Sequence, residues 1–224
     1  KLNKIEPKFI SKSNPRIGLI TLGSDFRIEK DFNNVVYGKD IDLYVNRIHC
    51  YNPLTNETLA KMAEDITDVT KDILPDQKID CVAYGCTSGT IAAGYDTIKS
   101  KINLAKPDAK VTTPITSTIK ALKKLDIKKI SIFTPYTNAI NNSVVNYFKK
   151  ENISVNSLTY FDIASDLDIG KVDENYLFEV LSKIDLEDSD ALFVSCTALP
   201  VLSIIDKLEK KLNKIILSSN QTLI

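Results

Sequence analysis

The chain has 224 residues, of which 43% are hydrophobic and 26% charged, a composition typical of folded globular proteins and not of disordered ones. Its 29 basic and 29 acidic side chains balance, so no excess of positive charge favours a nucleic-acid partner. The apolar runs are far shorter than the ~20 residues of a membrane-spanning helix, so we expect no membrane partner either.

The N-terminal residues and the cysteines narrow the class of protein further. Residues 1–14 are polar and rich in Lys and lack the order of a secretory signal, so we expect a cytoplasmic protein. No Cys-x-x-Cys pair is present and His49 is the only imidazole, which predicts no metal site, no disulfide framework and a surface or strand-end role for His49. The four cysteines are Cys50, Cys81, Cys86 and Cys196.

Short β-branched runs alternate along the chain with longer amphipathic segments, a pattern typical of parallel strands joined by helices. The predicted strands are Ile17–Leu22, Ile41–Ile48, Asp80–Gly85, Lys110–Thr113, Lys129–Thr134, Ser154–Thr159, Ala191–Ser195 and Ile215–Leu217. The predicted helices are Arg27–Val35, Asn56–Leu74, Ile115–Leu125, Asn138–Lys149, Glu174–Ile184 and Ala198–Leu212. Thr55 is the expected N-cap of the second helix, and Pro75 ends it. The sequence therefore predicts an α/β fold.

Two pairs of segments repeat along the chain at a nearly constant offset. Arg16–Ser24 resembles Lys129–Thr137, and Asp80–Gly89 resembles Asp190–Leu199, at offsets of 113 and 110 residues. Two matched pairs in the same order predict a duplicated half, in which one strand ends in a Thr/Gly/Pro loop and another in Cys-Thr. Chance similarity between short buried strands is the alternative explanation.

Cys86 and Cys196 each follow a predicted strand, the place where ligands bind in open parallel sheets. After Cys86 come Thr87, Ser88 and Gly89, which are residues that cap a helix and let backbone N–H groups approach an anion. A helix N-terminus lowers the pKa of a thiol. Cys86 is therefore a candidate base or nucleophile that needs no histidine.

The alternative for any single cysteine is a buried small hydrophobe, and we adopt this interpretation for Cys81 and Cys50. For Cys86 and Cys196, the matched placement favours chemistry. One thiol can remove a proton from one face of a substrate carbon while the other protonates the opposite face. Alternatively, one thiolate can add to an activated double bond. Either route is an isomerisation without a metal or an organic cofactor.

Five segments, spread in order over essentially the whole chain, carry a resemblance to known proteins. They are GLITLGSDFRIEKDF (Gly18 to Phe32), YGCTSGT (Tyr84 to Thr90), TPYTNAIN (Thr134 to Asn141), SCTALP (Ser195 to Pro200) and SSNQT (Ser218 to Thr222). The chain resembles the aspartate/glutamate racemase superfamily, in the branch of arylmalonate decarboxylases, maleate cis-trans isomerases and ectoine-utilisation racemase-like proteins. The Ser-Asp-x-x-x-Glu pattern and the Cys-Thr-Ser-Gly-Thr turn are most similar to the ectoine-utilisation members.

The resemblance implies two pseudo-symmetric, flavodoxin-like α/β lobes, each a parallel sheet flanked by helices, with the active site in the cleft between them. We expect the first lobe at residues 1–113 and the second at residues 114–212. Residues 213–224 are expected to return to the first lobe and to begin a last helix, capped by Ser219 or Asn220, whose remainder is missing. Members of the superfamily commonly self-associate, so a homo-oligomer is expected.

The resemblance also implies roles for individual residues, and it implies no cofactor. It makes Cys86 and Cys196 the catalytic pair. The residues it assigns to substrate binding are Ser24, Asp25, Thr87, Ser88, Tyr136, Asn141 and Thr197. For Asn141, support of the loop at Tyr136 and a place on a helix surface are the two alternatives.

Two positions distinguish the chain from parts of this superfamily. Arylmalonate decarboxylases lack a cysteine at the first turn, so Cys86 argues against plain decarboxylation. Maleate isomerases carry what looks like an Asn at the position of Asp25, where an ionised Asp would repel a substrate carboxylate and suit a cationic group. The alternative for Asp25 is a cap on the helix that follows it.

The sequence therefore predicts a cofactor-independent racemase or isomerase of a small carboxylic acid, either amino-acid-like or a dicarboxylate, with ectoine breakdown as a candidate setting. Three alternatives stay open. They are a maleate-type cis-trans isomerase with Cys86 as covalent nucleophile, an arylmalonate-type decarboxylase, and a non-catalytic receptor for a small metabolite.

Overall fold

The β-branched runs form two parallel four-stranded sheets in a computed structural model that describes residues 2–186 and 188–224. The first sheet has the order β2-β1-β3-β4 and the second the order β6-β5-β7-β8. The strands are β1 (Arg16–Leu22), β2 (Asp42–Ile48), β3 (Cys81–Gly85), β4 (Lys110–Thr112), β5 (Lys129–Thr134), β6 (Ser154–Tyr160), β7 (Ala191–Val194) and β8 (Ile215–Ser218). The predicted strands are thus confirmed, and the equal order of strands in both sheets agrees with the internal repeat.

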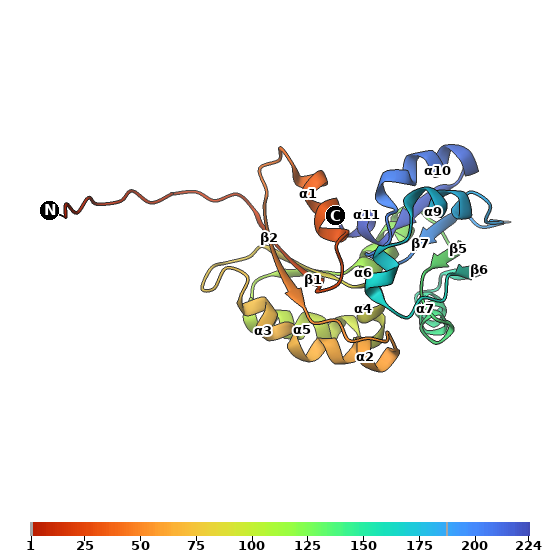
Figure 1. Cartoon of the computed structure of the whole chain (residues 1–224), viewed down its shortest axis with the longest axis horizontal. Coiled ribbons are helices and arrows are strands. Elements are labelled where there is room, and N and C mark those ends of the chain that lie inside the picture. The colour runs from red at the N-terminus through yellow and green to blue at the C-terminus, as the bar shows by residue number, and fades with distance from the viewer. Residues whose placement is uncertain (1, 187) are drawn as a thin grey trace.

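Helices flank both sheets, and the two halves lie side by side in Figure 1, with the N-terminal segment extending away from them. The predicted first lobe begins at Lys1, which lies outside the described residues. The helices are α1 (Ile28–Val36), α2 (Asn56–Lys61), α3 (Ile66–Lys71), α4 (Thr87–Ala93), α5 (Tyr95–Ala105), α6 (Pro114–Lys124), α7 (Asn138–Lys150), α8 (Asp166–Gly170), α9 (Glu174–Leu181), α10 (Ile205–Leu212) and α11 (Ser219–Leu223). The predicted α/β fold is confirmed.

The long helix predicted after Thr55 forms as a continuous helical run with one irregularity. Thr55 is the N-cap of this run, as predicted, and forms a capping box with Thr58. Between α2 and α3, the four residues Met62–Asp65 form a 3-10 turn, and the run ends at Lys71. Its end comes before Pro75 because Leu74 has a φ of 45°, which is outside the helical region.

Two predicted helix boundaries at the C-terminal side are wrong. The helix expected from Ala198 begins only at Ile205, after a 3-10 turn at Leu202–Ile204, because the residues before it form tighter turns. The amide of Val201 bonds the Leu199 carbonyl, and the amide of Ile204 bonds the Val201 carbonyl, both at 2.9 Å. The last helix is capped by Ser218, and not by Ser219 or Asn220, since Ser218 still has extended backbone dihedrals and its side chain accepts from the amide of Gln221.

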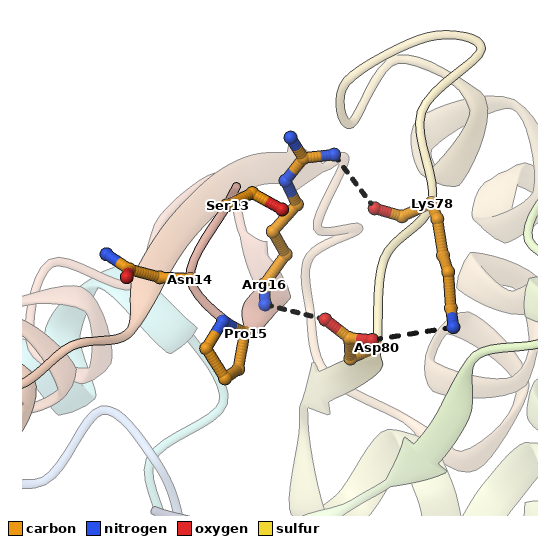
Figure 2. A pocket seen from close by; sticks show the side chains of 6 residues that line it. All are labelled: Ser13, Asn14, Pro15, Arg16, Lys78 and Asp80. Atoms are coloured by element: carbon orange, nitrogen blue, oxygen red, sulfur yellow. Dashed lines mark hydrogen bonds and ion pairs between the residues drawn. The ribbon is translucent and has the colours of Figure 1, made fainter. Parts of the chain in front are cut away.

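An equivalent pair of hydrogen bonds anchors the beginnings of the central strands in each half. The amide of Arg16 donates to Asp80 Oδ2 (2.9 Å), and the amide of Asp80 donates to the Arg16 carbonyl (3.0 Å). Lys129 and Asp190 repeat this arrangement at 3.1 and 2.8 Å. Figure 2 shows Arg16 and Asp80, with the hydrogen bond from the Arg16 amide marked, beside a surface pocket of about 590 Å³. Because Arg16 and Asp80 lie at the amino ends of β1 and β3, this pocket is at the opposite edge of the sheet from Cys86.

Residues 213–224 connect both halves. Strand β8 pairs with β7 and so belongs to the second sheet, in contrast to the expected return of the whole segment to the first lobe. Only α11, which follows, reaches the first half, where Asn220 Nδ2 donates to Asp31 Oδ2 at 2.7 Å. Among the described residues, none of the helices has the length and apolar character that crossing a bilayer requires.

Candidate active site

Cys86 lies between β3 and α4 and caps the helix with its own sulfur. Its side chain is 4% exposed, and the amide of Gly89 donates to Sγ at 3.2 Å. A Cβ atom at position 89 would lie 2.8 Å from this sulfur, so only glycine leaves room for the contact. The local sequence thus aims the first helical turn at a buried thiol.

Cys196 occupies the matching place after β7, where the backbone is strained. Its φ of +98° lies in the region that favours glycine, and its amide donates to Ser219 Oγ at 3.0 Å. The side chain is 6% exposed. A non-glycine residue in this conformation costs about 1–3 kcal/mol and is frequent at functional sites.

Tyr136 connects the two thiols. It follows β5 and is fully buried, and its hydroxyl group hydrogen-bonds the Cys196 thiol. Burial raises the pKa of Tyr136, and the charges that Cys196 and Cys86 carry when ionised raise it further. The phenol group thus contacts Cys196 of the second half and interacts electrostatically with Cys86 of the first half.

Both thiols have raised pKa values, and the predicted lowering at Cys86 is wrong for this structure. Burial raises the pKa of each thiol, and the nearby carboxylate of Asp166 adds to the effect. The amide of Gly89 opposes the rise at Cys86, as a helix N-terminus should, but it is the weaker influence. Both cysteines are therefore thiols in this state.

Asp25 is almost completely buried, and both of its oxygen atoms are hydrogen-bonded within the protein. Oδ1 accepts from the amides of Arg27 (2.7 Å) and Ile28 (3.1 Å), which confirms that it caps the start of α1. Oδ2 accepts from Thr197 Oγ1 at 2.8 Å, across the two halves. Burial raises the pKa of Asp25 despite these donors.

Other predicted binding residues are already engaged in hydrogen bonds. Thr87 Oγ1 lies 2.8 Å from Ser219 Oγ, and Ser88 Oγ lies 4.0 Å from the Cys86 sulfur. Asn141 is buried and donates through Nδ2 to the Tyr136 carbonyl at 3.1 Å. Support of the Tyr136 loop is thus the alternative that holds for Asn141.

Two residues that the sequence analysis did not assign to the site lie in it. Asp166, the first residue of α8, accepts from Ser24 Oγ at 2.6 Å and interacts electrostatically with Cys86 and Cys196. Cys50, interpreted above as structural, hydrogen-bonds Ser24, and burial followed by the Asp166 charge raises its pKa to about 11. The one shared signal is position, since each residue lies in the segment after one of the equivalent strands β2 and β6.

One family model and two relatives are similar to this chain in sequence. The sequence model of a family described as arylmalonate decarboxylase matches residues 41–223. A maleate isomerase from Geobacillus stearothermophilus is 30% identical over 175 residues, which cover 74% of this chain and 69% of the relative. A maleate isomerase from Alcaligenes faecalis is 25% identical over 154 residues, covering 65% of this chain and 61% of the relative.

Solved structures with the same fold include enzymes of both activities. A mutant maleate cis-trans isomerase from Nocardia farcinica, with a covalently bound succinylcysteine intermediate, aligns with a TM-score of 0.85 at 19% identity over 93% of this chain and 89% of that chain. A liganded double mutant of arylmalonate decarboxylase aligns with a TM-score of 0.79 at 19% identity, covering 93% of this chain and 88% of that chain.

Proposed function

Because this chain belongs to the arylmalonate decarboxylase family, we propose that Cys86 and Cys196 act together on one small carboxylic acid. The chain is a cofactor-independent isomerase of the aspartate/glutamate racemase superfamily. The observation that carries the proposal is the position of Tyr136, whose hydroxyl group hydrogen-bonds Cys196 and interacts electrostatically with Cys86. Thiols from both halves near one phenol group suit proton transfer to and from a single bound carbon.

In the proposed racemisation, one cysteine first loses its S–H proton to solvent and then, as a thiolate, takes the proton from the carbon beside the substrate carboxylate. The electron pair of the broken C–H bond moves into the carboxylate, which becomes an enediolate. The other cysteine gives its S–H proton to the opposite face of the carbon, and the electron pair returns. The centre is inverted, and the two cysteines have exchanged protonation states.

Exchange of the substrate α-proton for deuterium in deuterated water tests this reaction. A panel of amino and hydroxy acids is incubated with the native protein and with Cys86→Ala, Cys196→Ala and Cys81→Ala. We expect each of the first two variants to lose at least 100-fold in exchange rate, since each removes one proton carrier. Cys81 lies in β3, and the control variant should keep the native rate. Full exchange in both single variants would refute the two-thiol reaction.

Cis-trans isomerisation of a maleate-like diacid is the second candidate, supported by the 30% identical maleate isomerase and by the covalent intermediate of the Nocardia enzyme. In that reaction the Cys86 thiolate adds to one carbon of the double bond, and the π electron pair moves into the carboxylate on the other carbon, which becomes an enediolate. The new C–C single bond rotates, the electron pair returns to re-form the double bond, and the thiolate leaves. Incubation with maleate followed by mass spectrometry should reveal a dicarboxylate adduct on Cys86. An unmodified Cys86 together with no fumarate would remove this candidate.

The remaining expectations stay predictions. Decarboxylation is disfavoured by the presence of Cys86, and a role in ectoine breakdown rests on the sequence resemblance. If the protein were a non-catalytic receptor, an alkylating reagent would modify Cys86 and Cys196 at equal rates at every pH. Catalysis instead requires that the pKa of at least one of the two thiols is lowered. Self-association is testable by sedimentation of the native protein.

A further inference from the structure

Asp166 presents a carboxylate oxygen to the site that the protein leaves without a partner. The side chain is 4% exposed. Ser24 Oγ donates to Oδ2 at 2.6 Å, but within the described part of the chain Oδ1 accepts no hydrogen bond. Because the protein supplies no donor to this oxygen, Oδ1 is free to accept a hydrogen bond from a ligand.

Among the described residues, the titratable groups that interact electrostatically with Asp166 are acids or thiols. The groups that interact with it electrostatically are Asp25, Cys50, Cys86 and Cys196. Two arginines of the first half are engaged with other groups. Arg27 donates to the Gly170 carbonyl at 3.0 Å, and Arg47 forms an ion pair with Glu29 at 2.6 Å. The site therefore contains two buried carboxyl groups, and within residues 2–186 and 188–224 no cationic side chain forms an ion pair with Asp166.

Asp25 and Asp166 differ in their capacity to bind a ligand. The two oxygens of Asp25 hold the start of α1 and the Thr197 hydroxyl group. Asp166 holds only Ser24 through one oxygen. The cationic partner that the sequence suggested for Asp25 is thus better matched by Asp166.

We propose that Asp166 is the specificity-determining residue of this site and that its free Oδ1 binds an ammonium group of the substrate, which is an amino acid. This inference rests on the proposed function and names its substrate class. An ammonium group supplies the missing hydrogen-bond donor and neutralises the local negative charge, whereas a second substrate carboxylate would be repelled. Neutralisation also removes the field that opposes thiolate formation at Cys86 and Cys196.

Matched pairs of small acids test the assignment. L-aspartate and succinate, and L-alanine and propionate, differ within each pair only by the amino group. Binding is measured as protection of Cys86 against iodoacetamide, quantified by mass spectrometry. In the native protein, at least one amino compound should protect at a concentration ~10-fold lower than its partner, since a hydrogen bond to a charged group contributes about 1.5–3 kcal/mol.

Asp166→Asn keeps an acceptor for Ser24 and removes the charge. We expect this variant to lose the preference for the amino compound by ~10-fold and to bind succinate more tightly than the native protein does. Asp168→Asn is the control, because Asp168 lies in the same helix but is exposed and paired with Lys171 at 2.8 Å. It should keep the native preference.

Two results would overturn the assignment: no preference for either amino compound in the native protein, or an unchanged preference in Asp166→Asn. The proposed function fails on a different measurement, the Cys-dependence of α-proton exchange. Exchange that still requires Cys86 and Cys196, combined with an unchanged preference in Asp166→Asn, would reject the role of Asp166 alone.

Discussion

Burial and the neighbouring Asp25 charge raise the pKa of Asp166 to about 6, so the folded protein holds this proton more tightly than the unfolded chain does. The stabilisation this gives is fully present below the usual pKa of 3.8 and is lost as pH rises through about 6. Asp166→Asn should therefore be more stable than the native protein at pH 8, by roughly 2 kcal/mol, and should gain little at pH 4.

Urea unfolding at both pH values measures this difference. Asp168→Asn gives the comparison, because its exposed carboxyl group has a pKa that Lys171 lowers and that burial does not raise overall. An equal gain for Asp166→Asn at pH 4 and pH 8 would contradict the assigned cause.

The sequence was sufficient to find the residues that lie in short motifs. Cys86 and Cys196 each follow a strand and precede a Thr, so their shared position is visible in the letters alone. Asp166 and Cys50 could not be found in this way, because the long segments after β2 and β6 reach the site only through folding. The raised thiol pKa values were also out of reach, since burial depends on the packing of both halves.

Among the elements, α4 is the helix whose first turn shapes the site. Gly89→Ala would place a Cβ atom 2.8 Å from the Cys86 sulfur and 3.1 Å from the Tyr84 hydroxyl group. Because Ala favours helix formation, we expect the fold to persist while α-proton exchange falls at least 10-fold through displacement of the sulfur.

Gly18→Ala is the matched control for this variant. Its Cβ atom would meet only side-chain atoms of Ile73 and Ile79, at 3.4 Å or more. Circular dichroism and the exchange rate of both variants separate a local displacement from unfolding. A native exchange rate in Gly89→Ala would mean that the tight fit around Cys86 has no catalytic importance.

The spacing of hydrophobic residues along the chain, together with capping residues, predicted the strands and most of the helices. The helix α5 escaped prediction because Gly94, with a φ of 85°, separates it from α4 and interrupts the helical pattern. The start of α10 was misplaced because the apolar residues before Ile205 pack as a loop with a 3-10 turn. The residues at which helices begin and end depend on tertiary packing, whereas the presence of most helices and strands is visible in the local sequence.

For the whole molecule, hydrogen bonds join the two halves at the site. Thr197 Oγ1 donates to Asp25 Oδ2, and Ser24 Oγ to Asp166 Oδ2. Thr197→Val should weaken the contact between the halves, because it leaves a buried carboxylate oxygen without its donor at a cost of about 1–3 kcal/mol. We expect iodoacetamide to label Cys86 ~10-fold faster in this variant.

Ser203→Ala tests the specificity of that effect, because Ser203 donates to Glu174 at 2.6 Å on the exposed surface of the second half. Its Cys86 should label at the native rate. Equal rates in Thr197→Val and the native protein would indicate that the halves already separate freely. The duplicated architecture was foreseeable from the repeat, but these contacts across the halves were not, since they join residues 172 and 142 positions apart.

The burial of both cysteines affects how readily the protein is oxidised. Peroxide attacks a thiolate that it can reach, and the resulting sulfenic acid can progress to forms that cells do not reverse. With Cys86 and Cys196 protonated and almost entirely covered, the resting molecule offers neither of these conditions. Peroxide is therefore expected to oxidise Cys86 and Cys196 only slowly in the ligand-free protein.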